Sequence, residues 1–315
     1  MKMQAIQIRD AQPIVRSEDD IQNLYDRFIN YLDASPQTLE TYSRNLKQFF
    51  RYLYTEDIKR PTRPHILAYR KQLEDDGLKA TTIQAYIVVV RLFFKWTASE
   101  GLYPNVADNV KSPKLSKEHK KDYLTAEQIK NILNQIDTST ESGKRDYAMI
   151  ALMVTGGLRT IEVSRASIED LRARGGKTVL YIQGKGRTEK AEYVKISPAV
   201  ERYLRTYLQA RGNDAGNQPL FTSTSNNSKG NAMTTRSISK IVKNAFKKAG
   251  YNSERLTAHS LRHSSATLNL LNGGTLEETK QLLRHDNITT TMIYNHALER
   301  ADNKSEERIS GVLFD

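Results

Sequence analysis

The chain has 315 residues and a formal net charge of +12, from 48 Lys and Arg against 36 Asp and Glu. At about 100–200 residues per domain, this length predicts two domains, each with its own core. The absence of cysteine excludes disulfides, thiolate metal sites and a cysteine nucleophile. No apolar run approaches the roughly 20 residues that span a bilayer, and the first residues lack the apolar core of a secretory signal. We therefore expect an intracellular protein with no membrane partner.

Both halves of the sequence are basic. Residues 1–121 carry 20 Lys and Arg against 15 Asp and Glu, a net charge of +5, which leaves +7 for residues 122–315. Such a balance favours a polyanionic partner, and nucleic acid is the commonest one. A charge that serves only solubility is the alternative.

The first part of the chain predicts a helical domain over residues 19–110, after a tail over 1–18. Apolar residues recur at helical spacing between Ile21 and Leu32, and Ser35-Pro36 is typical of the start of a second helix. A third helix is expected from Pro64 to Asp76, and a fourth from Thr81 to near Gly101. The aromatic stripes of these helices indicate a core, and their basic residues are candidates for DNA contact. Residues 111–122 are rich in lysine and predict a flexible linker.

A second domain is expected over residues 123–300. It begins with helices at about 125–136 and 143–155, followed by a break at Gly156-Gly157. Residues 179–182 and 193–196 favour β-strands and predict a hairpin around Lys185, to which residues 168–171 can add a third strand. The polar stretch 221–233 predicts a surface loop. The expected fold class is mainly α with a small β-sheet.

Four histidines gather near the C-terminal end, at positions 259, 263, 285 and 296. Two histidines four residues apart on a helix can bind zinc, but the metalloprotease pattern needs Glu after the first, where Ser260 stands. An arginine between the two histidines also repels a cation. We expect no metal and no other cofactor.

The same region suits an anion. Arg159 and Arg262 offer planar forks that match phosphate oxygens. His259 and His285 can donate hydrogen bonds, and the Tyr294 hydroxyl can act as a nucleophile. These groups, with Lys185 on the hairpin, contain the parts that phosphoryl transfer needs, namely positive charge at the pentavalent centre and a proton donor.

Five motifs, in order, resemble those of the tyrosine recombinase (phage integrase) family. They are TGGLRTIE (155–162), GKG (184–186), HSLRH (259–263), LLRH (282–285) and TTTMIYNH (289–296). The 23 residues from Arg262 to His285 and the 9 from His285 to Tyr294 resemble the spacing of Xer-type members. The resemblance implies a helical SAM-like core-binding domain and an α+β catalytic domain that form a C-shaped clamp around duplex DNA.

The resemblance also implies a role for each catalytic residue. Tyr294 attacks the scissile phosphate and forms a 3′-phosphotyrosyl bond, while Arg159 and Arg262 hold the non-bridging oxygens. Lys185 acts as the general acid, His259 assists proton transfer and His285 donates to the phosphate. The surrounding positive charge is expected to help deprotonate Tyr294, whose ordinary pKa is about 10.

Several neighbours of these residues have alternative interpretations. Glu162 is expected to pair with an arginine, and His263 is a core or supporting residue. Arg187 and Lys190 are rivals of Lys185 for the general-acid role. The family usually has Gly before the second histidine, where this chain has Arg284, so Arg284 either adopts a strained turn or an ordinary helical geometry, and it can add a phosphate contact.

The predicted function is site-specific DNA recombination by a homotetramer on two DNA duplexes. Alternatives are relaxation of DNA as by a type IB topoisomerase and a DNA-binding regulator without catalysis. The short N-terminal tail leaves no room for an arm-binding domain, which favours dimer resolution in chromosome segregation or the integration and excision of a small mobile element. We expect a prokaryotic cytoplasmic, nucleoid-associated enzyme. Its C-terminal tail, residues 301–315, is expected to dock on a neighbouring protomer or on its own domain.

Overall fold

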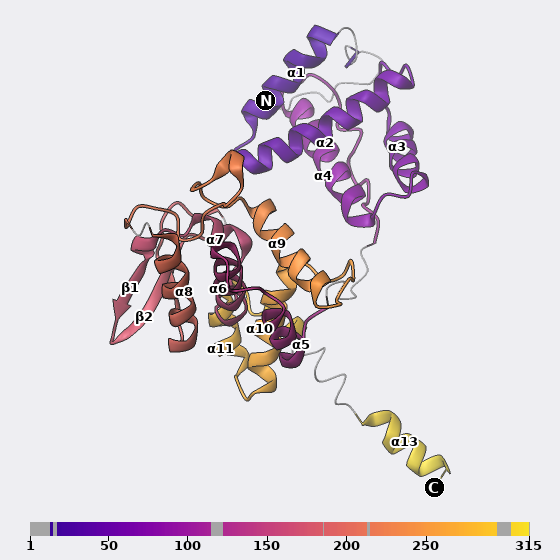
Figure 1. Cartoon of the computed structure of the whole chain (residues 1–315). Helices are drawn as coiled ribbons and strands as arrows, with labels where there is room; N and C mark the ends of the chain where they lie inside the picture. The colour runs from indigo at the N-terminus through magenta and orange to yellow at the C-terminus, as the bar shows by residue number, and fades with distance from the viewer. Residues whose placement is uncertain are drawn as a thin grey trace. The chain divides into compact units, whose positions relative to one another are not determined.

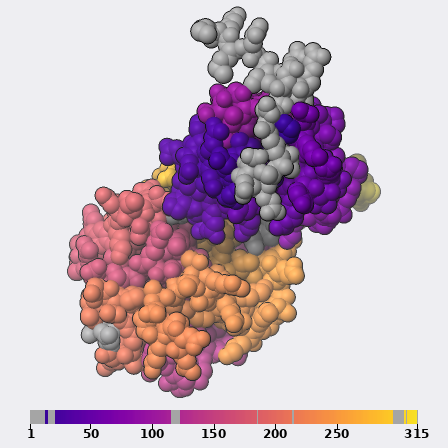
Figure 2. Space-filling view, turned by 90° about the horizontal axis from the view of Figure 1, so that it is seen from above, coloured from indigo at the N-terminus to yellow at the C-terminus, as the bar shows by residue number. Residues whose placement is uncertain are grey.

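The structure, a computed structural model, describes residues 13–14, 18–114, 122–184, 186–212, 215–294 and 304–314. The chain forms two compact units, residues 1–117 and 118–315. Each unit has its own hydrophobic core. Figure 1 shows the helices and strands of both units. In the space-filling view of Figure 2, the orange atoms around residue 240 form a broad part of the visible surface of the second unit.

The first unit is built from helices. They are α1 (Glu18–Tyr31), α2 (Pro36–Thr55), α3 (Arg63–Asp75) and α4 (Ala80–Ser99). Ser35 caps α2 by accepting a hydrogen bond from the Thr38 backbone N–H, and Pro36 occupies the first helical turn. The four helices predicted from apolar spacing are confirmed.

Aromatic side chains fill the core of the first unit. Phe28 packs edge-on against Phe93, with ring centroids 5.4 Å apart, and Phe49 packs in the same way against Tyr69 at 5.1 Å. All four rings are almost completely buried. Such packing contributes beyond the burial of apolar area alone, so the aromatic stripes of this unit serve its core.

The second unit contains the remaining elements. They are α5 (Ala126–Asn134), α6 (Glu141–Thr155), α7 (Thr160–Arg165), η1 (Ile168–Asp170), β1 (Leu171–Arg174), β2 (Lys177–Ile182), β3 (Glu192–Lys195), α8 (Pro198–Arg211), η2 (Asn226–Ser228), α9 (Thr235–Lys248), α10 (Ala258–Leu271), α11 (Leu276–Leu283) and α13 (Ser305–Phe314). Residues 289–294 are also helical. Helix α6 is buried along most of its length and contacts α8, α9 and α10. It is the central helix of this unit.

The small sheet is antiparallel, in the order β1-β2-β3, with Leu180 of β2 opposite Leu171 and Val194. The predicted hairpin is therefore confirmed. The expectation that residues 168–171 form the third strand is wrong, because Ile168–Asp170 is a 3-10 turn and β1 runs from Leu171 to Arg174. The Asp170 carboxylate accepts hydrogen bonds from the Ser167 backbone and hydroxyl, which closes this turn before the strand begins.

The predicted loop over residues 221–233 has little regular structure, since it contains only η2 and one isolated bridge between Thr222 and Ala232. Its ends, Phe221 and Met233, are buried in the core of the second unit. None of the helices among the described residues is both long and apolar enough to cross a membrane.

Candidate active site

Arg262 lies on α10 at the centre of the site, and its side chain is almost completely buried. One terminal nitrogen donates to the Gly157 carbonyl, in the turn between α6 and α7, and the other donates to the Leu283 carbonyl at the end of α11. Because these carbonyls are far apart in the sequence, the guanidinium joins two segments to α10. Those segments carry Arg159 and His285.

Arg159 is the residue before α7, and Glu162 fixes it in two ways. The Glu162 carboxylate accepts the Arg159 backbone N–H at 2.8 Å through Oε2 and pairs with Arg159 Nη1 at 2.9 Å through Oε1. The Glu162 side chain has no exposed area, whereas that of Arg159 is 31% exposed. Arg159 is therefore anchored at its base while part of its guanidinium faces the solvent, and the predicted pairing of Glu162 with an arginine is confirmed.

Arg284 follows α11 in the left-handed conformation, with φ 54° and ψ 48°. A residue with a Cβ pays about 1–2 kcal/mol for this backbone geometry, so the strained alternative expected for Arg284 is the one observed. Its guanidinium donates to the carbonyls of Gly156, Gly157 and Leu282 and to Glu162 Oε2. The group therefore faces the protein interior, and the expected phosphate contact of Arg284 stays a prediction.

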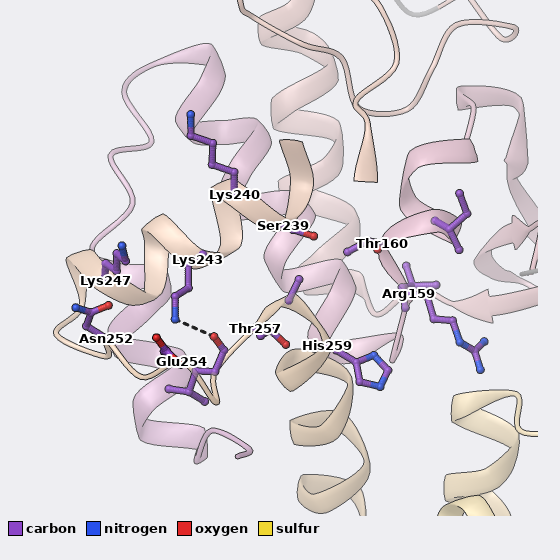
Figure 3. A pocket seen from close by; sticks show the side chains of 14 residues that line it. Arg159, Thr160, Ser239, Lys240, Lys243, Lys247, Asn252, Glu254, Thr257 and His259 are labelled. Atoms are coloured by element: carbon purple, nitrogen blue, oxygen red, sulfur yellow. Dashed lines mark hydrogen bonds between the residues drawn. The ribbon is translucent and has the colours of Figure 1, made fainter. Parts of the chain in front are cut away.

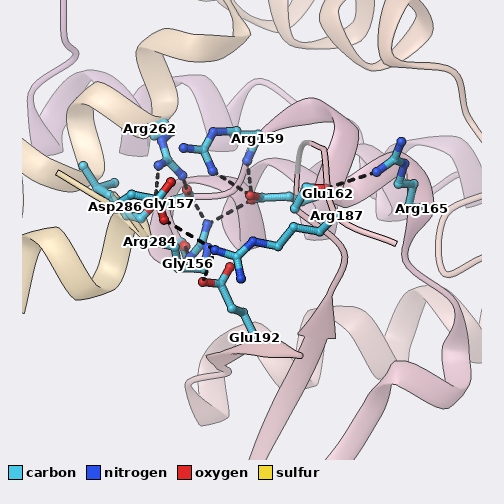
Figure 4. A network of polar contacts seen from close by, with 12 residues as sticks. Gly156, Gly157, Arg159, Glu162, Arg165, Arg187, Glu192, Arg262, Arg284 and Asp286 are labelled. Carbon is cyan, nitrogen blue, oxygen red and sulfur yellow. Dashed lines mark hydrogen bonds and ion pairs between the residues drawn. The ribbon is translucent and has the colours of Figure 1, made fainter. Parts of the chain in front are cut away.

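Three guanidinium groups thus gather around one buried carboxylate (Figure 4). Burial, followed by the charges of Arg159 and Arg284, lowers the pKa of Arg262 to about 9, although Glu162 and Tyr294 oppose this shift. Like charges in a region of low dielectric repel one another unless an anion lies nearby. One carboxylate is shared by three positive charges, so the cluster favours the binding of a further anion.

Two histidines and the tyrosine lie against this cluster. His259 and His263 are one turn apart on α10, with ring centroids 4.7 Å apart, and the His263 ring lies 5.2 Å from that of Tyr294. Nδ1 of His285 lies 2.9 Å from Oγ1 of the buried Thr291. The described residues Arg159, His259, Arg262, His285 and Tyr294 are therefore brought together from segments far apart in the sequence.

The protonation of His285 and Tyr294 is set by burial and by the arginines. Burial and then the charges of Arg262, Arg159, Arg284 and His259 lower the pKa of His285 to about 4. Its imidazole is therefore neutral at pH 7 and can donate one N–H. Burial raises the pKa of Tyr294 above its ordinary value, although Arg262 and Arg159 lower it. The two arginines therefore act in the expected direction, but burial, which the sequence did not reveal, outweighs them and leaves the pKa of Tyr294 above its ordinary value.

Lys185 lies outside the described residues, but the segments beside it are well anchored. Its rival Lys190 pairs with the buried Asp170 at 2.6 Å. Its other rival is Arg187, whose Nη2 lies 3.6 Å from Glu192 Oε1 and 3.4 Å from Asp286 Oδ1. Asp286 directly follows His285 in the sequence. The hairpin is therefore linked to the loop that carries His285.

A cleft of about 930 Å³ opens beside Arg159 and His259. Lysines 240, 243 and 247 of α9 line it from the other side, as Figure 3 shows. Lys243 donates to the carbonyls of Ser253 and Leu256 and so supports the loop before α10. Within the described parts of the chain, no three His, Asp or Glu side chains come together to hold a metal ion.

Sequence reasoning missed two supporting residues. Thr291 contacts His285, and its only signal was its place between His285 and Tyr294. Ser265 donates to the Val154 carbonyl and thereby fastens α10 to α6. A small hydroxyl residue on a helix gives no sequence signal for such a long-range bond.

Comparisons with known proteins show which family this chain resembles in sequence and fold. The model of the Phage integrase family matches residues 122–300, and that of the Phage integrase N-terminal SAM-like domain matches residues 25–101. Tyrosine recombinase XerD of Listeria innocua serovar 6a is 28% identical over 288 residues, which cover 87% of this chain and 94% of the relative. Tyrosine recombinase XerC of Oceanobacillus iheyensis is 28% identical over 304 residues, which cover 91% of this chain and 96% of the relative.

Solved structures share the fold. XerH site-specific recombinase, bound to palindromic difH substrate in a post-cleavage complex, aligns with a TM-score of 0.71 at 23% identity, over 93% of this chain and 86% of that one. A lambda integrase dimer bound to a COC′ core site aligns with a TM-score of 0.69 at 20% identity, over 87% of this chain and 76% of that one. The family model alone covers more than half of the sequence. The chain therefore belongs to the phage integrase family of tyrosine recombinases.

Proposed function

We propose that this protein is a site-specific DNA recombinase in which Tyr294 attacks a DNA phosphate. The observation that carries the proposal is the cluster of Arg159 and Arg262 with Tyr294, whose positive charge has one buried carboxylate to oppose it. A backbone phosphate supplies the anion that this cluster lacks. The family and the recombinases among its relatives support the same activity.

In the proposed reaction, the Tyr294 oxygen forms a bond to phosphorus and the bond from phosphorus to the 5′-oxygen breaks. The tyrosine proton leaves with the assistance of His259, and Lys185 protonates the departing oxygen. The product is a 3′-phosphotyrosyl bond and a free 5′-hydroxyl. Because one phosphate ester replaces another, a 5′-hydroxyl from another strand can reverse the reaction without ATP.

Arg159, Arg262 and His285 are the groups that stabilise the transition state in this proposal. Charge accumulates on the non-bridging oxygens as the pentavalent centre forms, and donors fixed in advance lower its energy without reorganisation. Arg159 and Arg262 are held by Glu162 and by backbone carbonyls before any substrate arrives. Neutral His285 supplies a further N–H donor.

The rest of the DNA is bound by basic residues on both units. In the proposed catalytic domain, residues 123–300, the lysines that line the cleft face the region beside Arg159 and His259. Residues 19–110 form the second DNA-binding part and residues 111–122 the linker. Phosphate contacts of this kind supply affinity without sequence readout.

The active assembly in this proposal is a homotetramer on two DNA duplexes. Helix α13 displays Ile309, Val312, Leu313 and Phe314, all of which are more than half exposed. An apolar surface of this kind suits docking on a neighbouring protomer. Dimer resolution in chromosome segregation, or integration and excision of a mobile element, on the nucleoid of a prokaryotic cell is the proposed setting.

The test begins with the DNA that is covalently captured on the protein in cells and sequenced. A duplex of that sequence, nicked near the cleavage position, then traps the covalent adduct, because the short cleaved fragment diffuses away. We expect an adduct with the wild type and none with Tyr294→Phe. An adduct that survives this substitution refutes Tyr294 as the nucleophile.

The same material separates the alternatives. DNA binding without an adduct favours a regulator. Relaxation of supercoiled DNA without recombinant products favours a topoisomerase. Deletion of residues 308–315 that leaves tetramer assembly and recombination unchanged rules out docking through α13.

A further inference from the structure

Arg284 makes more contacts than its backbone position requires. A turn with positive φ needs only a residue that tolerates that conformation, and glycine does so without strain. Here the turn carries a guanidinium whose side chain is only 6% exposed. Taking such a group out of water is unfavourable unless hydrogen bonds and an opposite charge compensate.

The partners of Arg284 belong to the segment that holds Arg159. Nη1 lies 3.1 Å from the Gly156 carbonyl oxygen, and Nη2 lies 2.9 Å from that of Gly157. Nη2 also lies 2.9 Å from Glu162 Oε2, the oxygen that accepts the Arg159 backbone N–H. One side chain therefore contacts both the turn that leads to Arg159 and the carboxylate that anchors it.

These bonds divide the Glu162 carboxylate between two arginines. Arg284 takes Oε2, and Arg159 reaches Oε1 through Nη1. If Arg284 were removed, Oε2 would keep only the bond from the Arg159 backbone N–H, and its second lone pair would be open to the Arg159 guanidinium. A bidentate pair is the geometry that an arginine and a carboxylate prefer. Such a pair would draw Arg159 towards Glu162 and away from a phosphate.

We propose that Arg284 is a positioning residue that holds Glu162 and the Gly156-Gly157 turn, so that Arg159 and Arg262 face the substrate phosphate. The inference rests on the proposed function, because it assumes that these two arginines bind the scissile phosphate. Arg262 belongs to the same arrangement, since it donates to the Gly157 carbonyl as well. The αL conformation at residue 284 is the geometry that brings the guanidinium to these acceptors.

The test uses Arg284→Gly in the full-length protein, because glycine suits the backbone and removes only the side chain. Two quantities are measured with the nicked duplex, namely the rate of adduct formation and the non-covalent affinity in a Tyr294→Phe background. We expect the rate to fall at least tenfold, while the affinity stays within about threefold. Arg284→Lys keeps the charge without the planar fork, and we expect an intermediate rate.

Two further measurements separate positioning from general stability. Guanidinium ion at millimolar concentration is expected to restore at least part of the rate of Arg284→Gly, whereas sodium at the same ionic strength is not. Arg145→Met is the matched control, since Arg145 is also buried and bonds to Asp146 and Thr222 in another part of the unit. Below its melting temperature, this control is expected to form the adduct within twofold of the wild-type rate.

The outcomes distinguish this inference from the proposed function. A wild type that forms no adduct refutes both. A wild type that forms the adduct, together with Arg284→Gly at the same rate, overturns the role of Arg284 alone. If Arg284→Gly does not fold, Arg284→Lys decides the matter, and its rate must lie at least threefold below that of the wild type.

Discussion

Arg262 and Arg284 donate to the same acceptor, the carbonyl oxygen of Gly157. A carbonyl has two lone pairs and can accept both bonds, but sharing it brings two positive charges together in a buried place. Burial, followed by the charges of Arg159 and Arg284, lowers the pKa of Arg262, and burial lowers the pKa of Arg284, while the Glu162 carboxylate opposes both shifts. The turn before α7 is thereby fixed by groups that a bound phosphate would further stabilise.

Glu162→Gln is expected to destabilise the second unit by about 3 kcal/mol or more. The substitution removes the negative charge from a buried ion pair and leaves the guanidinium of Arg284 without its counterion. Urea unfolding, followed by fluorescence or circular dichroism, measures the difference. Glu277→Gln is the control, because its pair with Lys280 lies at the surface and contributes at most about 0.5 kcal/mol. Equal stabilities of the two variants would contradict the importance of the buried pair.

Gly157→Ala is expected to cost more than Gly175→Ala, although both glycines have a φ of 56°. At each position alanine pays about 1–2 kcal/mol for the left-handed backbone. A Cβ on Gly157 would also lie 2.9 Å from Leu283 Cδ2, whereas one on Gly175 would meet nothing within 4 Å. The difference between the two free energies of unfolding therefore isolates the contact between the turn and α11.

The same pair of variants checks the site. Gly157→Ala is expected to slow formation of the covalent adduct, because it strains the backbone of the residue whose own carbonyl accepts a hydrogen bond from Arg262. Gly175→Ala lies in the turn between β1 and β2 and is expected to leave the rate unchanged. Identical rates in both variants would show that the turn does not position Arg159 and Arg262 for the proposed reaction.

The helices and the hairpin could be predicted because their signals are local. Ser35-Pro36 and Thr125 mark helix starts that the structure contains, through hydrogen bonds to residues three positions later. The third strand was misplaced because Ile168 is apolar and suits a strand, while the Asp170 carboxylate that closes the 3-10 turn acts through its side chain. Strand propensity does not account for a side chain that bonds to the nearby backbone in place of a strand partner.

The order of five motifs pointed to Arg159, His259, Arg262, His285 and Tyr294, which the fold brings together, but the electrostatics of this cluster could not be predicted. The buried state of Arg262 depends on two carbonyls that are 105 and 21 residues away. The raised pKa of Tyr294 depends on its packing with Ala266 and Leu283, which no spacing reveals. Burial is a property of the folded chain, and it decides that the pKa of Arg262 is lowered and that of Tyr294 is raised.

The stability of the protein is expected to depend on the protonation of His285. Its pKa is about 4 in the folded protein, below the ordinary value of about 6.5, so the unfolded chain binds the proton more readily. The free energy of unfolding should therefore fall as the pH drops from about 6.5 towards 4, and this contribution is fully present above that window.

Urea unfolding between pH 7.5 and 4.5 tests this dependence. We expect a shallower slope in His285→Gln, because the substituted side chain does not titrate. His65→Gln is the control, since His65 caps α3 in the first unit, outside the arginine cluster. A His285→Gln variant with the slope of the wild type would contradict the assignment.

The lysines of α9 are expected to set the salt dependence of DNA binding. Lys240 and Lys247 are exposed and line the cleft beside Arg159 and His259. Each lysine that neutralises a phosphate releases counterions. The plot of log affinity against log salt should therefore become less steep, by about 0.9 in slope, for each lysine replaced by alanine. Fluorescence anisotropy with a duplex of unrelated sequence, in a Tyr294→Phe background, measures the slope.

Arg205→Ala is the control, because Arg205 lies on α8 and pairs with Glu201 outside the cleft. Loss of slope in the control, or none in the α9 variants, would place the DNA on another surface, since only residues that contact phosphates change the number of counterions released.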